Sequence, residues 1–480
     1  MGNYETTGKK VNPQTVKLAP IFSGLFMGLG QLTVLKQYIR GAFFALAEIV
    51  MLLFTLFQFK VEEIKGTVKT VTKVFRFNPG QSPIIQSLKG LITLGDKNDN
   101  LAVKYRDHSV FMLITGLIVL IITVIFIVLY VYNIKDAKKS AGKIIENGYP
   151  TMLQTKKEME QTAFPAFGII PIILLISFFT LIPLLFSALV AFTNYSSPDH
   201  IPPANTVDWV GFQSFADMFA RKTTTGESNA WAAAFGSIAI WTVIWAVFAT
   251  FTCFFVGFFF AVILQDKRVS IPKFYRTIFI LPYAIPTMLS LFIWANLLNG
   301  TFGPINRTLQ YIGLIQQGIP WLSSPSMAKV TLILVNIWIG FPYSMILTTS
   351  SMTAIPNSLY EAAVIDGATK WTQFTKITFP LVMFQTGPLL IMQFASNINN
   401  FGAVFFLTGG GPNLIIGGQN ATISTQAGAT DLLISWIYKL TMNSNNYNTA
   451  SVLSILVFIV LVPFAVFQFT RTKSFKDGEI

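Results

Sequence analysis

The stretch EAAVIDGATKWTQFTKITFP, residues 361–380, combines charges and helix breakers between two long apolar segments. The residues that follow Pro356 are good helix formers, and a proline suits the first turn of a helix. Gly367 can adopt the left-handed conformation in which helices commonly end. Thr369 can then cap a second short helix. The sequence therefore predicts two short helices joined at Gly367.

The second short helix carries an apolar stripe. Trp371, Phe374 and Ile377 recur at helical spacing, and Pro380 is predicted to end this helix before the next apolar segment. Such a stripe could face a protein partner or lie on lipid headgroups. The residues alone leave both alternatives open, because each arrangement buries the same stripe.

The whole chain has the composition of a polytopic membrane protein. Of its 480 residues, 52% are hydrophobic and 11% are charged, whereas soluble domains carry about 25% charged residues. The single cysteine, Cys253, excludes an intrachain disulfide. Eight apolar segments are each long enough to cross a bilayer. They lie at about 41–59, 109–133, 165–194, 232–265, 277–298, 328–349, 381–408 and 447–470.

Basic residues orient these spans. From the third span onward, the predicted inner segments hold 15 Lys and Arg and the outer segments hold 4. The positive-inside rule therefore places both termini and the opening stretch in the cytoplasm. The outer loop 60–108 breaks the rule with nine basic residues, and its alternating VKTVTKVFRF predicts a small β-rich or interfacial element. The Gly-rich segment 18–36 is expected to lie at the interface or to re-enter the membrane.

Neutral polar residues recur at helical spacing in three consecutive spans. The fifth span has Tyr283, Thr287 and Ser290, the sixth has Asn336, Gly340 and Tyr343, and the seventh has Gln393, Ser396, Asn397 and Asn400. Such residues either pack membrane helices together or line a solute path. Three concurrent stripes favour the path, and amides and hydroxyls, which both donate and accept, suit a polyhydroxyl solute.

Charged residues are almost absent from the spans. Lys329 sits at the end of the sixth span, no charged residue lies deeper inside spans three to eight, and only Glu48 lies within the first. This scarcity disfavours a secondary transporter or a channel. The sequence contains no G-x-x-x-x-G-K-S/T loop, no paired carboxylates for a glycosyltransferase and no adjacent histidines for a metal. We therefore expect a transport subunit without catalytic residues, cofactor or metal, which receives its energy from a partner.

The opening stretch resembles the EAA loop of permease subunits in bacterial ATP-binding-cassette importers. The match consists of Glu361-Ala362-Ala363, Gly367, Ile377 and Phe379-Pro380, with Phe379 where leucine is usual. The resemblance implies a coupling helix seated in a cleft of an ATPase subunit, with Glu361 as its docking charge and Gly367 as its bend. The coupling residues that it implies are Glu361, Ala362, Ala363, Gly367, Trp371 and Phe374.

Further fragments extend the resemblance over about 165–480, to the larger, MalF-type permease subunit of maltose importers. They are FTNYSS (192–197), ILPYAIP (280–286), VNIWIGFPY (335–343), NINNF (397–401), LTGGGP (407–412) and TDLLISWIYK (430–439). The resemblance implies an all-α, type I importer permease fold with about eight transmembrane helices. It divides the chain into an N-terminal region, 1–164, with two spans and a basic loop, and a permease core, 165–480, with six spans and the coupling loop at 350–380. Only residues 195–231 occupy the place where some members carry a large extracellular domain.

The same resemblance implies a sugar site and a set of partners. The matched sugar-contact positions are Tyr283, Thr287, Ile339, Gly340, Tyr343, Gln393, Ser396, Asn397 and Asn400. Ser396 stands where the maltose type has a phenylalanine, so a hydrogen-bonding group replaces a stacking one. The expected substrate is maltose or maltodextrin, with galacto-oligosaccharides or cyclodextrins as alternatives. The expected partners, at the bacterial plasma membrane, are a second, MalG-type permease, two ATPase subunits and an extracellular or lipid-anchored sugar-binding protein.

Overall fold

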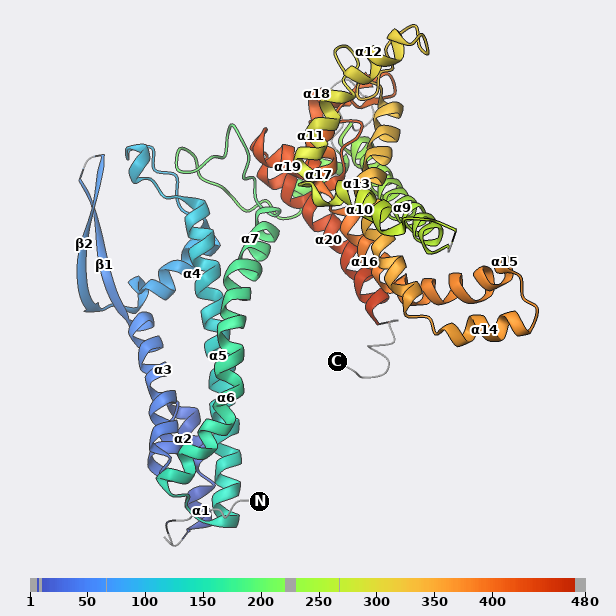
Figure 1. The fold of residues 1–480 in the computed structure, drawn as a ribbon. Coiled ribbons are helices and arrows are strands. Elements are labelled where there is room, and N and C mark those ends of the chain that lie inside the picture. Colours follow the sequence, from blue (N-terminus) through green and yellow to red (C-terminus); the bar gives the residue numbers. More distant parts are fainter. Residues whose placement is uncertain (1–6, 8–10, 66, 221–229, 267, 471–480) are drawn as a thin grey trace. The chain divides into compact units, whose positions relative to one another are not determined.

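The computed structural model describes residues 7, 11–65, 67–220, 230–266 and 268–470, and the chain forms two compact units (Figure 1). Unit 1 comprises Met1–Gly211 and unit 2 comprises Phe212–Ile480. Helices make up most of both units, and the strands among the described residues form two separate two-stranded sheets. The predicted all-α fold class is confirmed.

Unit 1 contains three long helices, one β-hairpin and several short elements. In chain order they are α1 (Pro13–Val16), α2 (Ala19–Leu25), the π-helix η1 (Gly30–Val34), α3 (Tyr38–Leu56), β1 (Phe57–Lys65), β2 (Val68–Phe77), the 3-10 turn η2 (Pro79–Gln81), α4 (Pro83–Thr93), the 3-10 turn η3 (Val103–Tyr105), α5 (Ser109–Asn147), α6 (Met152–Ile176), the π-helix η4 (Ser177–Leu181) and α7 (Ile182–Val190).

The Gly-rich segment 18–36 folds back against α5 through a buried polar network. The Ser23 hydroxyl donates to Gln31 Oε1 at 2.6 Å, and Gln31 Nε2 donates to Asn133 Oδ1 at 3.0 Å. All three side chains are buried. Because each buried polar group has a partner, the short helices α2 and η1 can pack against an apolar span at little cost.

The basic loop after the first span contains the predicted β element. Strands β1 and β2 pair antiparallel, with Phe57 opposite Phe77 and Lys65 opposite Val68. The register shifts between Gln58 and Lys60, which marks a bulge near the base of the hairpin. Strand β2 coincides with the alternating VKTVTKVFRF, so the alternation correctly predicted an extended strand.

Unit 2 contains the remaining spans and the short helices between them. In chain order they are α8 (Gln213–Ala220), α9 (Ala230–Gln265), α10 (Pro272–Ala284), α11 (Thr287–Leu297), α12 (Pro304–Tyr311), α13 (Pro325–Thr353), α14 (Asn357–Ile365), α15 (Lys370–Gln373), the π-helix η5 (Phe374–Thr378), α16 (Phe379–Ile398), α17 (Phe401–Leu407), β3 (Ile415–Ile416), β4 (Gln419–Asn420), α18 (Ala421–Thr425), α19 (Leu433–Met442) and α20 (Tyr447–Phe469).

Each of the eight predicted spans coincides with helical structure. In the described residues, six helices are long and apolar enough to cross a membrane, and the bent pair α10–α11 makes a seventh. The eighth predicted span is α20, whose apolar part Tyr447–Pro463 is shorter than the others. The predicted span 381–408 is divided, because α16 ends at Ile398 and α17 begins at Phe401.

A hydrophobic core of unit 2 packs α9 against α11, α13 and α17. Trp241 and Trp245 of α9 lie in it with Leu291, Leu332 and Val404. Both indole N–H groups have acceptors: Trp241 Nε1 donates to the Thr430 carbonyl at 3.2 Å, and Trp245 Nε1 to the Asn397 carbonyl at 3.1 Å. A buried tryptophan usually finds such a partner, and here these bonds fix α9 beside the segments that form the site.

Candidate functional site

Unit 2 encloses a cavity of about 580 Å³, within the range of small-molecule sites. Helices α10, α11, α13, α16 and α17 contribute its walls. The lining residues are Tyr283, Thr287, Leu291, Leu332, Asn336, Ile339, Ser396, Asn399, Asn400, Phe401, Gly402 and Ala403. The polar groups in this set are amides and hydroxyls, and no lining residue is charged.

Two breaks in the helices open this cavity. Between α10 and α11 the chain bends by 89°, next to Pro286, and Tyr283 and Thr287 flank the bend. Proline removes a backbone donor and favours such a break. Between α16 and α17, Asn400 caps the new helix by accepting a hydrogen bond from the Ala403 N–H at 3.2 Å. Irregular backbone at membrane depth occurs where it lines a cavity or is buried in protein.

Five of the nine predicted sugar-contact residues line the cavity. They are Tyr283, Thr287, Ile339, Ser396 and Asn400. Tyr343 lies next to them, with its ring centroid 6.1 Å from that of Tyr283. Tyr283 is 54% exposed and Tyr343 is 39% exposed, so the pair offers aromatic surface beside the polar lining.

The other predicted contacts, Gly340, Gln393 and Asn397, do not line the cavity. Asn397 is buried and its Nδ2 donates to Thr250 Oγ1 at 2.9 Å, which ties α16 to α9. At Gly340, an added Cβ would lie 2.8 Å from Cys253 Sγ, so a close contact between α13 and α9 requires glycine there. These two residues occupy packing positions, which the sequence left open as the alternative.

Six lining residues were not predicted from the sequence, namely Leu291, Leu332, Asn399, Phe401, Gly402 and Ala403, and Asn336 was placed on a polar stripe only. Asn399 and Phe401 lie at the break between α16 and α17. The consecutive asparagines of NINNF were the available signal, since asparagine favours helix caps and turns.

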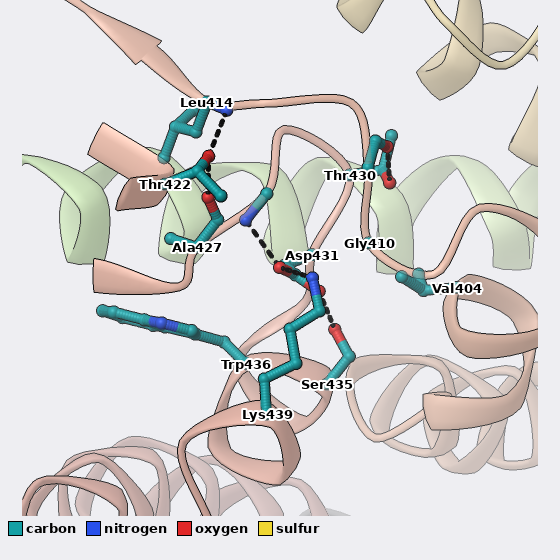
Figure 2. A network of polar contacts seen from close by, with 12 residues as sticks. Val404, Gly410, Leu414, Thr422, Ala427, Thr430, Asp431, Ser435, Trp436 and Lys439 are labelled. Carbon is teal, nitrogen blue, oxygen red and sulfur yellow. Dashed lines mark hydrogen bonds and ion pairs between the residues drawn. The ribbon is translucent and has the colours of Figure 1, made fainter. Parts of the chain in front are cut away.

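Beyond the cavity, a buried carboxylate holds the end of α17 (Figure 2). Asp431 is fully buried, and its Oδ2 accepts hydrogen bonds from Lys439 Nζ at 2.7 Å and from the Gly428 N–H at 2.6 Å. Its Oδ1 accepts from the Ser435 hydroxyl at 2.9 Å. We name Gly428, Asp431, Ser435 and Lys439 the carboxylate clamp. Burial raises the pKa of Asp431, and the ammonium of Lys439 opposes that rise.

The carboxylate clamp joins two of the sequence fragments that carry the family resemblance. Gly410 follows α17 and packs so closely against Asp431 that a Cβ there would overlap the carboxylate. The neighbouring Thr408 and Thr430 hydroxyls lie 2.8 Å apart, and the Thr430 N–H donates to the Gly410 carbonyl at 3.1 Å. LTGGGP and TDLLISWIYK are therefore joined by a network of hydrogen bonds at the end of α17 that lies away from the cavity.

The segment 356–380 forms the predicted pair of helices. Helix α14 is capped at Asp366, and Gly367 has a φ of +74°, which is the left-handed conformation. Thr369 caps α15 by accepting from the Thr372 N–H at 3.2 Å. The prediction that Pro380 ends this helix is wrong, because Lys370–Ile398 is one continuous helix. The π-helical η5 directly before the proline changes the bonding pattern, which accommodates the missing N–H.

Exposed and anchored side chains alternate in this segment. Glu361 and Ala362 are exposed, Ala363 is half-buried, and Trp371 is 71% exposed. The predicted stripe is divided, because Phe374 packs on Phe258 of α9 with ring centroids 5.8 Å apart. Ile377 lies against the same core.

Contacts within unit 2 hold this segment in place. The Tyr360 hydroxyl lies 2.9 Å from Thr378 Oγ1, which links α14 to η5. In the loop after α9, Arg268 donates to Asp266 at 2.8 Å and holds the pKa of that carboxyl well below its usual range, and Lys370 adds to the effect. The exposed helix α14 and the exposed first turn of the Lys370–Ile398 helix therefore stand on a packed base. In the described part of the chain, no group of His, Cys, Asp and Glu is arranged to hold a metal ion.

Several apolar spans, an uncharged polar cavity at helix breaks and an exposed helical pair together define a membrane transport subunit. Residues 254–472 match the family described as binding-protein-dependent transport system inner membrane component. The chain is 37% identical over 393 residues to the galactooligosaccharides transport system permease protein GanP of Bacillus subtilis, and the aligned region covers 81% of this chain and 88% of that protein. It is 35% identical over 403 residues to the maltodextrin transport system permease protein MalC of Streptococcus pneumoniae, with coverage of 82% and 87%.

A solved structure supports the same fold. The chain resembles a bacterial alginate ABC transporter, in complex with alginate pentasaccharide-bound periplasmic protein, with a TM-score of 0.52 and 20% identity over 66% of this chain and 96% of that one. The chain belongs to the inner membrane component family of binding-protein-dependent transport systems and is a multi-pass permease subunit. The resemblance to MalF-type permeases is confirmed.

Proposed function

We propose that this chain is the oligosaccharide-conducting permease subunit of an ATP-driven importer, with maltodextrin as its substrate. The observation that carries the proposal is the cavity of about 580 Å³, lined by amides, hydroxyls and aromatic rings without a charged residue. Amides and hydroxyls can pair with sugar hydroxyls in either direction. The neutral lining suits an uncharged solute, and a buried unpaired charge would be costly in such a cavity.

The nine predicted contacts divide by position within this proposal. Residues that line the cavity, such as Thr287, Ser396 and Asn400, meet the sugar directly. Tyr283 and Tyr343 offer ring faces for stacking. Gly340 and Asn397 act on the sugar path through the packing of α9 against α13 and α16. Gln393 is half-buried on α16 and stays a predicted contact.

The identity of the sugar rests on relatives that differ. MalC is named a maltodextrin permease and GanP a galactooligosaccharide permease, and they are similarly close to this chain. The maltodextrin assignment follows the motifs of the maltose type, while Ser396 departs from that type. Galacto-oligosaccharides are the second candidate, and cyclodextrins the third.

The exposed helical pair at 356–380 receives force from an ATPase subunit in this proposal. Glu361 supplies a docking charge, and the left-handed Gly367 sets the bend between α14 and α15. Ala362 and Ala363 present little side-chain bulk, so the backbone of α14 can approach a partner closely. Trp371 supplies exposed aromatic surface, and Phe374 anchors the segment to α9. ATP hydrolysis then belongs to the partner.

The complete importer contains, in this proposal, a second homologous permease, two ATPase subunits and an extracellular or lipid-anchored sugar-binding protein. The positive-inside pattern supports cytoplasmic termini in the bacterial plasma membrane. Residues 1–164 form an accessory region, and residues 165–480 form the permease core. The family match at 254–472 lies within that core.

A transport screen in a reconstituted complex tests the proposal. The complex is supplied with maltose, longer maltodextrins, galacto-oligosaccharides and cyclodextrins, with ATP inside the vesicles. ATP-dependent uptake of maltodextrins is expected. Uptake of a different sugar class, without uptake of maltodextrins, would replace maltodextrin as the assigned substrate. Uptake that persists without the ATPase subunits would instead favour a secondary transporter.

A further inference from the structure

The basic hairpin β1–β2 has no role in the proposed transport cycle, and its charge breaks the positive-inside pattern. Residues 57–77 carry five Lys and Arg against two Glu. The hairpin follows the membrane span α3 without a linker, since Leu56 ends the helix and Phe57 begins the strand (Figure 1). Because a strand rises about 3.3 Å per residue, its first residues lie within about 10 Å of the end of the span.

Five phenylalanines gather at this junction. We name Phe54, Phe57, Phe59, Phe75 and Phe77 the phenylalanine collar. The rings of Phe57 and Phe75 stack with centroids 4.8 Å apart, and Phe54 of the span stacks on Phe59 of the hairpin at 5.3 Å. Phe75 and Phe77 nevertheless remain 64% and 67% exposed. The collar is thus an ordered aromatic surface that the described residues of unit 1 leave largely uncovered.

At the base of the hairpin, the face opposite the collar is polar and satisfied. Gln58 is buried, its Oε1 accepts from Arg76 Nε at 2.9 Å and from Asn78 Nδ2 at 3.1 Å, and its Nε2 donates to the Lys60 carbonyl at 2.7 Å. Successive residues of a strand point to opposite faces, so the base of the hairpin is amphipathic. A lone two-stranded hairpin is marginal in water, and its aromatic face therefore needs a surface to cover it.

Two cations are available beside the collar. Lys73 is exposed and, within the described residues, forms no ion pair, and Arg76 is bonded to the neutral Gln58. By contrast, Lys60 and Lys69 are both paired with Glu62, at 3.0 and 2.6 Å. Free positive charge next to exposed aromatic rings is the pattern that suits the headgroup level of an anionic membrane.

We propose that the base of the β1–β2 hairpin is a membrane anchor. The phenylalanine collar lies at the boundary between headgroups and acyl chains, and Lys73 and Arg76 contact anionic phosphates. Continuity with α3 favours lipid as the occupant, because the collar is held at the depth where the bilayer surface begins. The anchor fixes the depth of α3 and accounts for basic residues in an outer loop.

Spin labels at two positions of the hairpin test this proposal. Cys253 is the only cysteine and is buried, so a Cys253→Ser chain can carry one label at Phe77→Cys or, as the matched control, at Val68→Cys, the first residue of β2, at the far end of the hairpin. The full-length chain is reconstituted with its partner subunits in phosphatidylcholine vesicles, with or without phosphatidylglycerol. Collision rates with oxygen and with a water-soluble nickel chelate report the depth of each label.

We expect the label at 77 to collide often with oxygen and rarely with the nickel chelate. The label at 68 should collide often with the nickel chelate. Changing Lys73→Gln or Arg76→Gln should reduce the ratio of inserted to exposed label about fivefold in anionic vesicles, with no change in neutral ones. Equal nickel access at both positions would overturn the proposal. Shielding of residue 77 from both reagents would also overturn it, and would indicate a protein partner. Phe75→Cys repeats the test if the first variant fails to assemble.

Discussion

Removing the carboxylate at the centre of the carboxylate clamp tests how the end of the cavity-lining helix is held. In Asp431→Ala, the Lys439 ammonium, the Gly428 N–H and the Ser435 hydroxyl all lose an acceptor. The side chains of Asp431 and Lys439 are 0% and 16% exposed, so water cannot fully replace it. Breaking a buried ion pair on one side costs about 3–5 kcal/mol of unfolding free energy.

A solvent-exposed pair supplies the matched control. Lys156 and Glu160 lie 3.9 Å apart with side chains 66% and 64% exposed, and Glu160→Ala should cost less than about 1 kcal/mol. The double change Asp431→Ala with Lys439→Met removes the charge that the single change leaves buried. It should therefore recover part of the loss.

Unfolding of the purified chain in mixed micelles, titrated with denaturing detergent, gives the free energies. Sugar uptake by the reconstituted complex gives KM in parallel, and KM should rise because α17 lines the cavity at its other end. The reasoning is refuted if Asp431→Ala is as stable as Glu160→Ala. It is also refuted if adding Lys439→Met makes the single variant less stable.

Five further substitutions test the proposed coupling and the cavity. Either Glu361→Lys or Gly367→Pro should abolish sugar-stimulated ATPase activity while the subunit still reaches the membrane. Proline disrupts the bend because it cannot adopt a positive φ. Normal stimulation in both variants would exclude the coupling role. Asn400→Ala should raise KM for the sugar in the uptake assay. Asn397→Ala should mainly lower the free energy of unfolding, by about 0.6 kcal/mol, as for other hydrogen bonds between membrane helices. The reverse pattern would contradict the assignment of Asn400 to the cavity lining and of Asn397 to helix packing. Ser396→Phe adds an aromatic ring to the cavity wall and should lower KM for maltose relative to longer maltodextrins, and a uniform change across chain lengths would argue against stacking.

Local sequence signals predicted much of the fold because they act over short distances. Apolar runs located every span, and alternation located β2 at Val68–Phe77. Gly367 ended α14 through its left-handed backbone, and the Thr369 hydroxyl capped the helix that begins at Lys370. The prediction that Pro380 ends the helix was wrong because proline breaks the hydrogen bonds of a regular α-helix, whereas the π-helical η5 precedes Pro380 here.

The candidate site was predictable only in part. Helical period placed Ser396, Asn397 and Asn400 on one arc of the seventh span, but the arc faces two environments. Ser396 and Asn400 line the cavity, while Asn397 turns its amide to Thr250. The break that separates α16 from α17, and thereby brings Asn399 and Phe401 to the cavity, gave only a weak signal in the sequence.

The sequence by itself therefore determined the membrane spans, the strand and the bend of the coupling segment, since hydropathy and backbone preference belong to neighbouring residues. Only the tertiary structure decided which polar residues line the cavity, which pack helices together, and that Asp431 meets Lys439 beneath α17. The physical reason is that periodicity defines which side chains share a face, whereas their role depends on what the packed helices place opposite that face.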